Sequence, residues 1–257
     1  MQPYTATEIM ALTAGSLVQN NDILFAGTGL SMLAATVAKR IHAPDAVVFF
    51  ETGGIDPSLA ELPLAVADPR VMVGTSVNSG LADALSILGH PKFRTIAFLG
   101  AAQIDCYGNL NSTMLGTYEN PKQRFPGSGG ACDASSLAFG VIVFMQHEYR
   151  RFVKQLDYFT SPGWIRGFDS RQKAGFKRGG PIAVVTNLGV LKFDRTTRMM
   201  FLDQYYPFTD PDTIASKTGF DLDISRARKC PLPGEAELKM LRQEVDPQRL
   251  ILGPMPG

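Results

Sequence analysis

Cysteine and histidine are scarce in this sequence, which limits the metal and redox chemistry that it can support. Its 257 residues contain three of each, namely Cys106, Cys132, Cys230, His42, His90 and His147. The cysteines form no C-x-x-C pair, and the histidines share no metal-ligand spacing. We therefore expect no bound metal, and reduced thiols of the kind found in cytoplasmic proteins.

A charge excess and long apolar runs are also missing. The 25 Lys and Arg residues balance 24 Asp and Glu residues, so the chain lacks the overall charge that attracts nucleic acids or anionic membranes. No apolar run approaches the roughly 20 residues that span a bilayer. The N-terminus lacks the basic-then-apolar layout of a signal peptide. We expect a cytoplasmic protein that binds neither nucleic acid nor membrane.

Short apolar runs alternate with helical patterns along most of the chain. Thr5 and Glu8 have the spacing of a capping box and predict a helix start. Further helices are expected over residues 32–41, 81–88 and 235–242. Strands are expected over residues 22–26, 46–50, 70–73, 95–99 and 139–145, with a hairpin over 183–193. Residues 103–131 resemble an extended loop region. The alternation predicts an α/β fold with an open, mostly parallel sheet flanked by helices, in one domain over residues 1–257.

Glu51 lies where an apolar run ends in the glycine turn Thr52-Gly53-Gly54. A carboxylate at the end of a sheet strand lies where open α/β folds place their ligands. Two adjacent glycines allow positive φ and leave space for a bulky group to approach. The alternatives are a catalytic carboxylate and a carboxylate that caps a helix or orders the turn.

Two other glycine clusters suggest anion binding. Gly27-Thr28-Gly29 lies between a strand and a helix, but Met32 stands where a dinucleotide fingerprint needs its third glycine. A tight strand-to-helix turn is the alternative. Residues 127–133, Gly-Ser-Gly-Gly-Ala-Cys-Asp, are a stronger candidate, because successive amides can form a nest for an oxyanion or a phosphate. Cys132 within them lacks an activating motif, so a small buried thiol is the favoured interpretation.

Polar side chains elsewhere have structural and functional interpretations. Asp105, Asn109, Asn111 and Ser112 suit either binding of an acid or ordering of a turn, and the turn is preferred. The basic cluster at residues 150, 151 and 154 suits either phosphate binding or a solvated helix face, and the helix face is preferred.

Several motifs together resemble class I CoA-transferases, and within them β subunits of the glutaconate CoA-transferase type. They are Glu51 after its strand, Gly-Ala-Ala-Gln-Ile-Asp at 100–105, Tyr-Gly-Asn-Leu-Asn-Ser-Thr at 107–113, Gly-Ser-Gly-Gly-Ala at 127–131, and segments at 146–152, 160–164 and 218–222. The resemblance runs essentially from end to end. It implies a class I CoA-transferase fold.

The resemblance also implies roles for individual residues. Glu51 corresponds to the family's catalytic nucleophile, although Thr52 stands where the family has serine. The G-x-G-G-A motif, which lies beside the CoA thioester in the family, falls on Gly127, Gly129, Gly130 and Ala131. A separate α subunit completing the site is implied, in an α2β2 or larger assembly.

The implied reaction transfers CoA from an acyl-CoA to a carboxylic acid, such as a glutaconate-like dicarboxylate, through a glutamyl-CoA thioester on Glu51. It needs no permanently bound cofactor, since CoA thioesters are substrates. An acyl-CoA hydrolase or decarboxylase on the same scaffold, and a non-catalytic CoA- or dinucleotide-binding subunit, are the alternatives.

Overall fold

The computed structural model describes residues 4–254, and the chain groups into two compact units. Unit 1 combines residues 1–99 with 232–257, and unit 2 is the continuous segment 100–231. Assignment of residues 1–257 to one domain stays a prediction. No helix of the described chain has the length and apolar character needed to cross a membrane.

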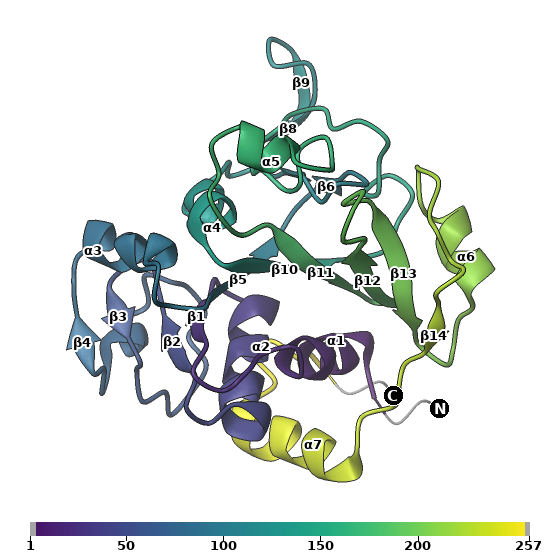
Figure 1. Ribbon diagram of the computed structural model, residues 1–257. Coiled ribbons are helices and arrows are strands. Elements are labelled where there is room, and N and C mark those ends of the chain that lie inside the picture. The colour runs from purple at the N-terminus through teal and green to yellow at the C-terminus, as the bar shows by residue number, and fades with distance from the viewer. Residues whose placement is uncertain (1–3, 255–257) are drawn as a thin grey trace. The chain divides into compact units, whose positions relative to one another are not determined.

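Unit 1 contains five neighbouring sheet strands in the order β5-β1-β2-β3-β4 (Figure 1). The strands are β1 (Ile23–Phe25), β2 (Val47–Phe49), β3 (Gly54–Ile55), β4 (Val77–Asn78) and β5 (Thr95–Gly100). β1 pairs in parallel with β2 and β5, whereas β3 pairs antiparallel with β2 and β4. The parallel pair β1 and β2 is joined through a helix, while the antiparallel pair β2 and β3 is joined by a tight turn.

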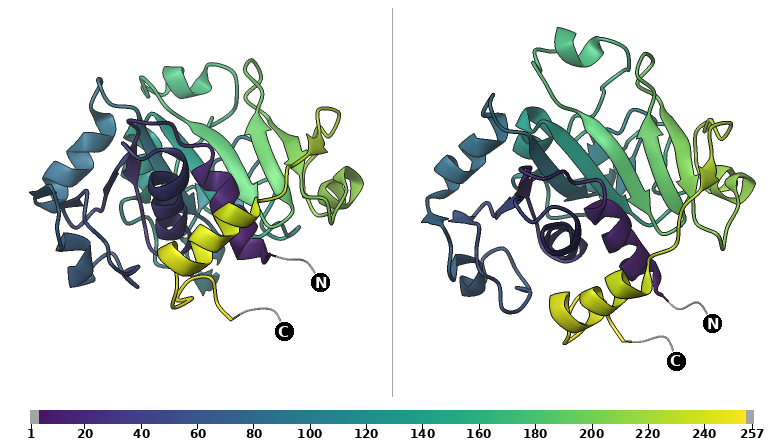
Figure 2. Two further views of the ribbon diagram at one scale, coloured as in Figure 1. Left: turned by 90° about the horizontal axis from the view of Figure 1, so that it is seen from below. Right: turned by 60° about the horizontal axis from the view of Figure 1, so that its bottom comes forward.

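Within unit 1, the first and the last helix of the described chain lie side by side (Figure 2). The helices of this unit are α1 (Ala6–Gly15), α2 (Leu30–Val37) continuing as a π-helix over Ala38–His42, α3 (Leu81–Ser86) with a 3₁₀ turn over Ile87–Gly89, and α7 (Glu235–Met240) continuing as a π-helix over Leu241–Val245. The predicted capping box is confirmed, because Thr5 Oγ1 accepts from the Glu8 amide and Glu8 Oε2 accepts from the Thr5 amide.

Glu8 also receives two hydrogen bonds from Arg242, at 2.7 and 2.9 Å. Its side chain is fully buried. Burial alone would raise the pKa of Glu8, but the bonds from Arg242 and the Thr5 amide outweigh it and lower the pKa. The first helix is therefore locked to the C-terminal helix by a bidentate, charge-assisted pair.

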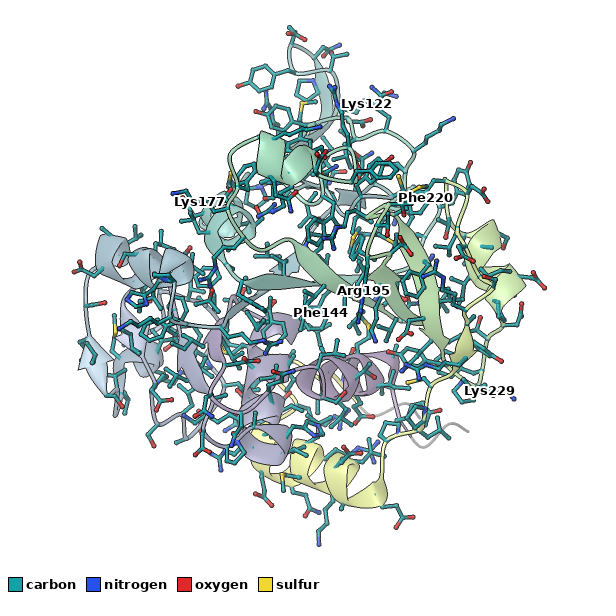
Figure 3. The ribbon with its side chains drawn as sticks, in the orientation of Figure 1. Lys122, Phe144, Lys177, Arg195, Phe220 and Lys229 are labelled. Atoms are coloured by element: carbon teal, nitrogen blue, oxygen red, sulfur yellow. The ribbon has the colours of Figure 1, made fainter. Side chains whose placement is uncertain are left out.

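Unit 2 contains a second run of five strands in the order β14-β13-β12-β11-β10. They are β10 (Gly140–Met145), β11 (Pro181–Thr186), β12 (Gly189–Phe193), β13 (Met200–Tyr205) and β14 (Arg228–Lys229). β10 pairs in parallel with β11, and β13 pairs in parallel with β14. β12 pairs antiparallel with both β11 and β13. Unit 2 also contains the helices α4 (Ala131–Leu137), α5 (Ser170–Lys173) and α6 (Pro211–Ser216). Phe144 of β10 is buried, whereas Lys122 and Lys229 are exposed (Figure 3).

Two predictions about local structure are wrong. The strand predicted at residues 70–73 is replaced by a 3₁₀ helix over Pro69–Met72, because Pro69 fixes a helical φ and Asp68 accepts from the Arg70 amide. The expected loop at residues 103–131 contains two short antiparallel hairpins. Their strands are β6 (Gln103–Ile104), β7 (Leu110–Asn111), β8 (Met114–Gly116) and β9 (Pro121–Arg124). Strands of two to four residues are too short to carry a recognisable alternation.

Candidate active site

Glu51 lies in the tight turn that joins β2 to β3 in unit 1. The Gly53 amide donates to Phe50 O and the Phe50 amide donates to Gly54 O, both at 3.0 Å. The Glu51 side chain is half-buried, and within residues 4–254 its carboxylate has no hydrogen-bond or ion-pair partner. A capping or turn-ordering carboxylate would accept a backbone amide. The structure therefore disfavours that alternative and leaves both oxygens of Glu51 available to react.

The glycines after Glu51 are required by the packing of the chain itself. Gly53 has φ +107°, as predicted, and a Cβ there would lie 1.9 Å from Ser79 O. A Cβ on Gly54 would lie 2.3 Å from Val71 O. The expectation that these glycines leave space for another group is thus corrected, because the backbone of the segment before α3 fills that space.

Hydrogen bonds fix the Glu51 turn from both sides. The Ser79 amide donates to Gly53 O at 3.0 Å, and the Thr52 hydroxyl donates to Val66 O at 2.9 Å. The side chain of Thr52 therefore has a structural role, which a serine hydroxyl could also perform. The backbone that carries the Glu51 side chain is therefore held in place, while no described group pairs with the carboxylate itself.

The predicted glycine motif forms a loop of unit 2 that leads into α4. Gly127 and Gly129 have φ of +94° and +49°, and no atom lies within 4 Å of a Cβ built on either. The amides of Ser128, Gly129 and Gly130 donate to no acceptor in the described part of the chain. Three successive amides are therefore free to bind an anion.

Side chains and backbone around this loop hold it in shape. Ser112 Oγ donates to Gly127 O at 2.9 Å, and the Gly127 amide donates to Ser112 O at 3.1 Å. The Cys132 amide donates to Ser128 Oγ at 2.9 Å. The Cys132 thiol lies in the first turn of α4 and is half-buried, so it is more accessible than the expected small buried thiol. Gly127, Gly129 and Gly130 thus lie in one loop and Ala131 is the first residue of α4, while Glu51 belongs to the other unit.

A pocket of about 320 Å³ lies beside the glycine loop. Ser112 and Gly127 form part of its wall, and the remaining wall is mostly apolar. Among the described residues, Arg151 is the one charged side chain that lines it. A pocket of this size can hold a small organic group.

The basic cluster divides into residues with different environments. Residues 149–151 form a turn, so the expected helix face is wrong. Arg150 and Arg151 both donate to Glu148 Oε2, at 2.7 and 3.2 Å. The Arg150 side chain is 77% exposed, whereas that of Arg151 is 31% exposed and reaches the pocket. Sequence alone does not separate these neighbours.

The polar residues that follow β6 order turns, as preferred from the sequence. Asp105 Oδ1 accepts from the amides of Tyr107 and Asn109, at 2.9 and 3.0 Å. Asn109 Oδ1 accepts from the amides of Gly163 and Ile165. Burial raises the pKa of Asp105 despite these hydrogen bonds. Asn111 is buried and donates to Gln103 Oε1 and Met114 O.

The other glycine cluster forms the tight turn that was the alternative to a dinucleotide site. Gly29 has φ +68° and caps α2, which starts at Leu30. No group of three or more histidines, cysteines or carboxylates within residues 4–254 is placed to bind a metal.

Arg171 on α5 is a structural residue that no sequence pattern indicates. Its side chain is 1% exposed and its guanidinium donates to backbone carbonyls of Ser135, Pro162 and Gly163, among others. Burial lowers the pKa of Arg171 to about 10. Since Ser135 is on α4, Arg171 ties the helix that follows the glycine loop to the rest of unit 2. The carbonyls of Gly163, Pro162 and Ser135 lie eight, nine and 36 residues before Arg171, so no local motif reveals the contact.

Known proteins resemble this chain along nearly its whole length. The family model for coenzyme A transferase matches residues 7–217. The B subunit of glutaconate CoA-transferase from Acidaminococcus fermentans is 43% identical, over 97% of this chain and 95% of its own. The B subunit of 3-oxoadipate CoA-transferase from Pseudomonas knackmussii is 31% identical, over 94% of both chains.

The fold agrees with the sequence match. The crystal structure of glutaconate CoA-transferase from Acidaminococcus fermentans superposes with a TM-score of 0.94 at 41% identity, covering 98% of each chain. The predicted fold class, an open and mostly parallel sheet flanked by helices, is confirmed by this superposition. Both the family model and the 43% identical relative cover far more than half of the residues. This chain belongs to the coenzyme A transferase family.

Proposed function

We propose that this chain is the B-type subunit of a CoA-transferase that moves CoA from an acyl-CoA to a carboxylic acid, with Glu51 as nucleophile. The observation that carries the proposal is the Glu51 carboxylate, which is fixed on a turn by its backbone but has no partner among the described residues. The similarity to the B subunit of glutaconate CoA-transferase supports a short dicarboxylic acid such as glutaconate as a substrate.

The first half of the reaction transfers CoA to the enzyme. A Glu51 oxygen attacks the acyl carbonyl carbon, the carbon–sulfur bond breaks, and CoA leaves as the thiolate. The thiolate then attacks the side-chain carbonyl of Glu51 in the resulting anhydride. The anhydride bond to Glu51 breaks, the donor acid leaves as its carboxylate, and a glutamyl-CoA thioester remains.

The second half reverses these steps with a different acid. The acceptor carboxylate attacks the glutamyl thioester and again releases CoA thiolate. The thiolate attacks the acceptor's carbonyl carbon in the new anhydride, which gives the new acyl-CoA and the free Glu51 carboxylate. Each anhydride formation expels one thiolate and each collapse consumes it, so no net proton or electron is exchanged.

The glycine loop at Gly127, Gly129, Gly130 and Ala131 has the second role in this proposal. Each attack places negative charge on a carbonyl oxygen, which fixed amide donors stabilise. The free amides of residues 128–130 and the open space beside Gly127 and Gly129 support binding of the CoA thioester there. The proposal requires no permanently bound cofactor.

The proposal also includes a separate α-type partner chain, in an α2β2 or larger assembly. The support is that the similar proteins are themselves named as B subunits. A cytoplasmic location is proposed as well, supported by three free cysteines within the described chain.

The decisive experiment loads the purified complex with acyl-CoA in the absence of an acceptor acid. Peptide mass spectrometry should find CoA on the peptide that contains Glu51, and borohydride should trap the thioester. Glu51→Ala should lower transfer by about 10³-fold or more without loss of assembly. An unmodified Glu51 in a complex with proven turnover would refute the mechanism. Rapid release of free CoA without an acceptor would indicate a hydrolase instead.

A further inference from the structure

The pocket beside the glycine loop combines apolar walls with a cation. Ala101, Ala102, Phe125 and Pro126 provide apolar wall, and Arg151 is the one charged side chain that the described chain contributes. A short carbon chain that ends in an anion needs this combination, because the chain gains from apolar contact and the anion needs a cation. The volume of about 320 Å³ lies near the lower end of small-molecule sites, which favours a small acyl group.

Arg151 is held in position but retains free donors. Its amide donates to Glu148 O, and its carbonyl accepts from the Ile104 amide, both at 2.8 Å. Its Nε donates to Glu148 Oε2 at 3.2 Å, and Nη1 lies 3.5 Å from Ala101 O. Nη2 donates to no acceptor among residues 4–254. A guanidinium fixed on one side with donors left on the other is prepared to bind a carboxylate.

The local charge favours a singly charged group. Arg150 and Arg151 share the carboxylate of Glu148, so the three side chains leave one net positive charge. One carboxylate neutralises that charge, whereas the diphosphate of CoA would leave negative charge uncompensated.

The other end of the pocket lies at the proposed thioester site. Gly127 belongs both to the pocket wall and to the glycine loop. A Cβ on Gly127 would meet no atom within 4 Å, so the space beside it is open. A substrate could extend from the loop to Arg151 along the apolar wall.

We propose that this pocket binds the carbon chain of a dicarboxylic substrate and that Arg151 binds its distal carboxylate. The inference rests on the proposed CoA transfer, and it makes Arg151 a determinant of substrate specificity. The Glu51 nucleophile would react with either a monocarboxylic or a dicarboxylic acid, and Arg151 would favour the latter.

The test compares Arg151→Gln with wild type, each as the complex with its partner chain. Acetyl-CoA serves as donor, with glutaconate or propionate as acceptor. We expect the KM for glutaconate to rise about tenfold to a hundredfold, because a charge-assisted bond is lost. The KM for propionate and for acetyl-CoA should change by less than about twofold. Arg150→Gln is the matched control, since it removes a second cation from Glu148 but is 77% exposed and does not line the pocket.

Two outcomes would overturn the proposal. One is an unchanged KM for glutaconate in Arg151→Gln. The other is a rise in the KM of Arg151→Gln for acetyl-CoA that is the same whether glutaconate or propionate is the acceptor. That result would show that Arg151 binds the phosphates of CoA. Should Arg151→Gln fail to assemble, Arg151→Lys replaces it, and the same selective rise is expected at a smaller size. Loading of Glu51 by acetyl-CoA is measured in parallel, and its failure in wild type would count against the transfer mechanism instead.

Discussion

Gly53 and Ser79 contact each other so closely that no room is left for a side chain at position 53. The Gly53 carbonyl accepts from both the amide and the hydroxyl of Ser79, at 3.0 and 3.3 Å. In return, Ser79 O occupies the place where a Cβ of residue 53 would be. The position of the Glu51 carboxylate therefore depends on a contact made 28 residues further along the chain.

Gly53→Ala should displace the turn and lower CoA transfer by about 100-fold, since a misplacement of about 1 Å can cost that much. The substitution introduces both a clash and an unfavourable positive φ. The initial rate of transfer and the loading of Glu51 measure the effect. Gly80→Ala is the matched control, because Gly80 has φ −86° and a Cβ there meets only Asp83 Oδ2 at 3.8 Å. Equal rates for the two variants would contradict the structural role of Gly53.

Arg171→Met should destabilise the protein by about 2–4 kcal/mol, because several buried carbonyls lose their donor. Denaturant unfolding monitored by circular dichroism measures the change. Lys173→Met on the same short helix is the control, since the Lys173 side chain is 75% exposed and its ion pair with Asp169 lies at the surface. A loss of stability similar to that control would show that the carbonyls find other partners.

Protonation of His147 should destabilise the fold as the pH falls. The ring is buried, Nε2 is hydrogen-bonded to Thr218 Oγ1, and the ring stacks on Phe152. Burial, followed by the charge of Lys217, lowers the pKa of His147 from 6.5 to about 3. Between these values the unfolded state binds a proton that the folded state does not. The free energy of unfolding is therefore unaffected by this group above pH 6.5. As the pH decreases from 6.5 toward 3, the free energy of unfolding falls by about 1.4 kcal/mol per pH unit.

Thermal melts between pH 4.5 and 7.5 test this expectation. The slope of the melting temperature against pH below 6.5 should be smaller in His147→Gln than in wild type, whatever the stability of the variant at pH 7.5. Parallel slopes would assign the acid sensitivity to other groups.

Cys106 should react slowly with alkylating agents at neutral pH. Burial, and then the charge of Asp105, raise the pKa of the Cys106 thiol to about 11. At pH 8 only about one molecule in a thousand would carry the thiolate, which is the reactive form. Iodoacetamide labelling followed by peptide mass spectrometry should show a rate that increases tenfold per pH unit up to about pH 10. Fast labelling at pH 7.5 would contradict the assigned environment.

The sequence predicts elements where the signal is local. The capping box of Thr5 and Glu8, the strand before Glu51, and the hairpin near Leu188 each depend on neighbouring residues, and all three are confirmed. The short strands β6 to β9 are not predicted from the sequence, because their pairing depends on contacts between strands, such as that of Asn111 with Gln103.

The residues of the candidate site also fall into two groups, those that a local motif indicates and those that only the tertiary structure identifies. Glu51 and the glycine loop carry motifs that are visible in the sequence. Arg151 differs from Arg150 because its side chain reaches the pocket. This difference depends on the tertiary structure and cannot be predicted from two neighbouring arginines in the sequence. The need for glycine at residue 53 arises from Ser79 and is also a property of packing.

The pairing of Glu8 with Arg242 has a consequence for the order of events during synthesis. Unit 2 is continuous and 132 residues long, and all of it is made between the two parts of unit 1. At about 5–20 residues per second, the ribosome needs about 7–26 s to make it. Throughout that interval the first helix has been synthesised without the arginine that neutralises its buried carboxylate. Unit 2 can therefore finish folding on the nascent chain first, and unit 1, which carries Glu51, is completed last.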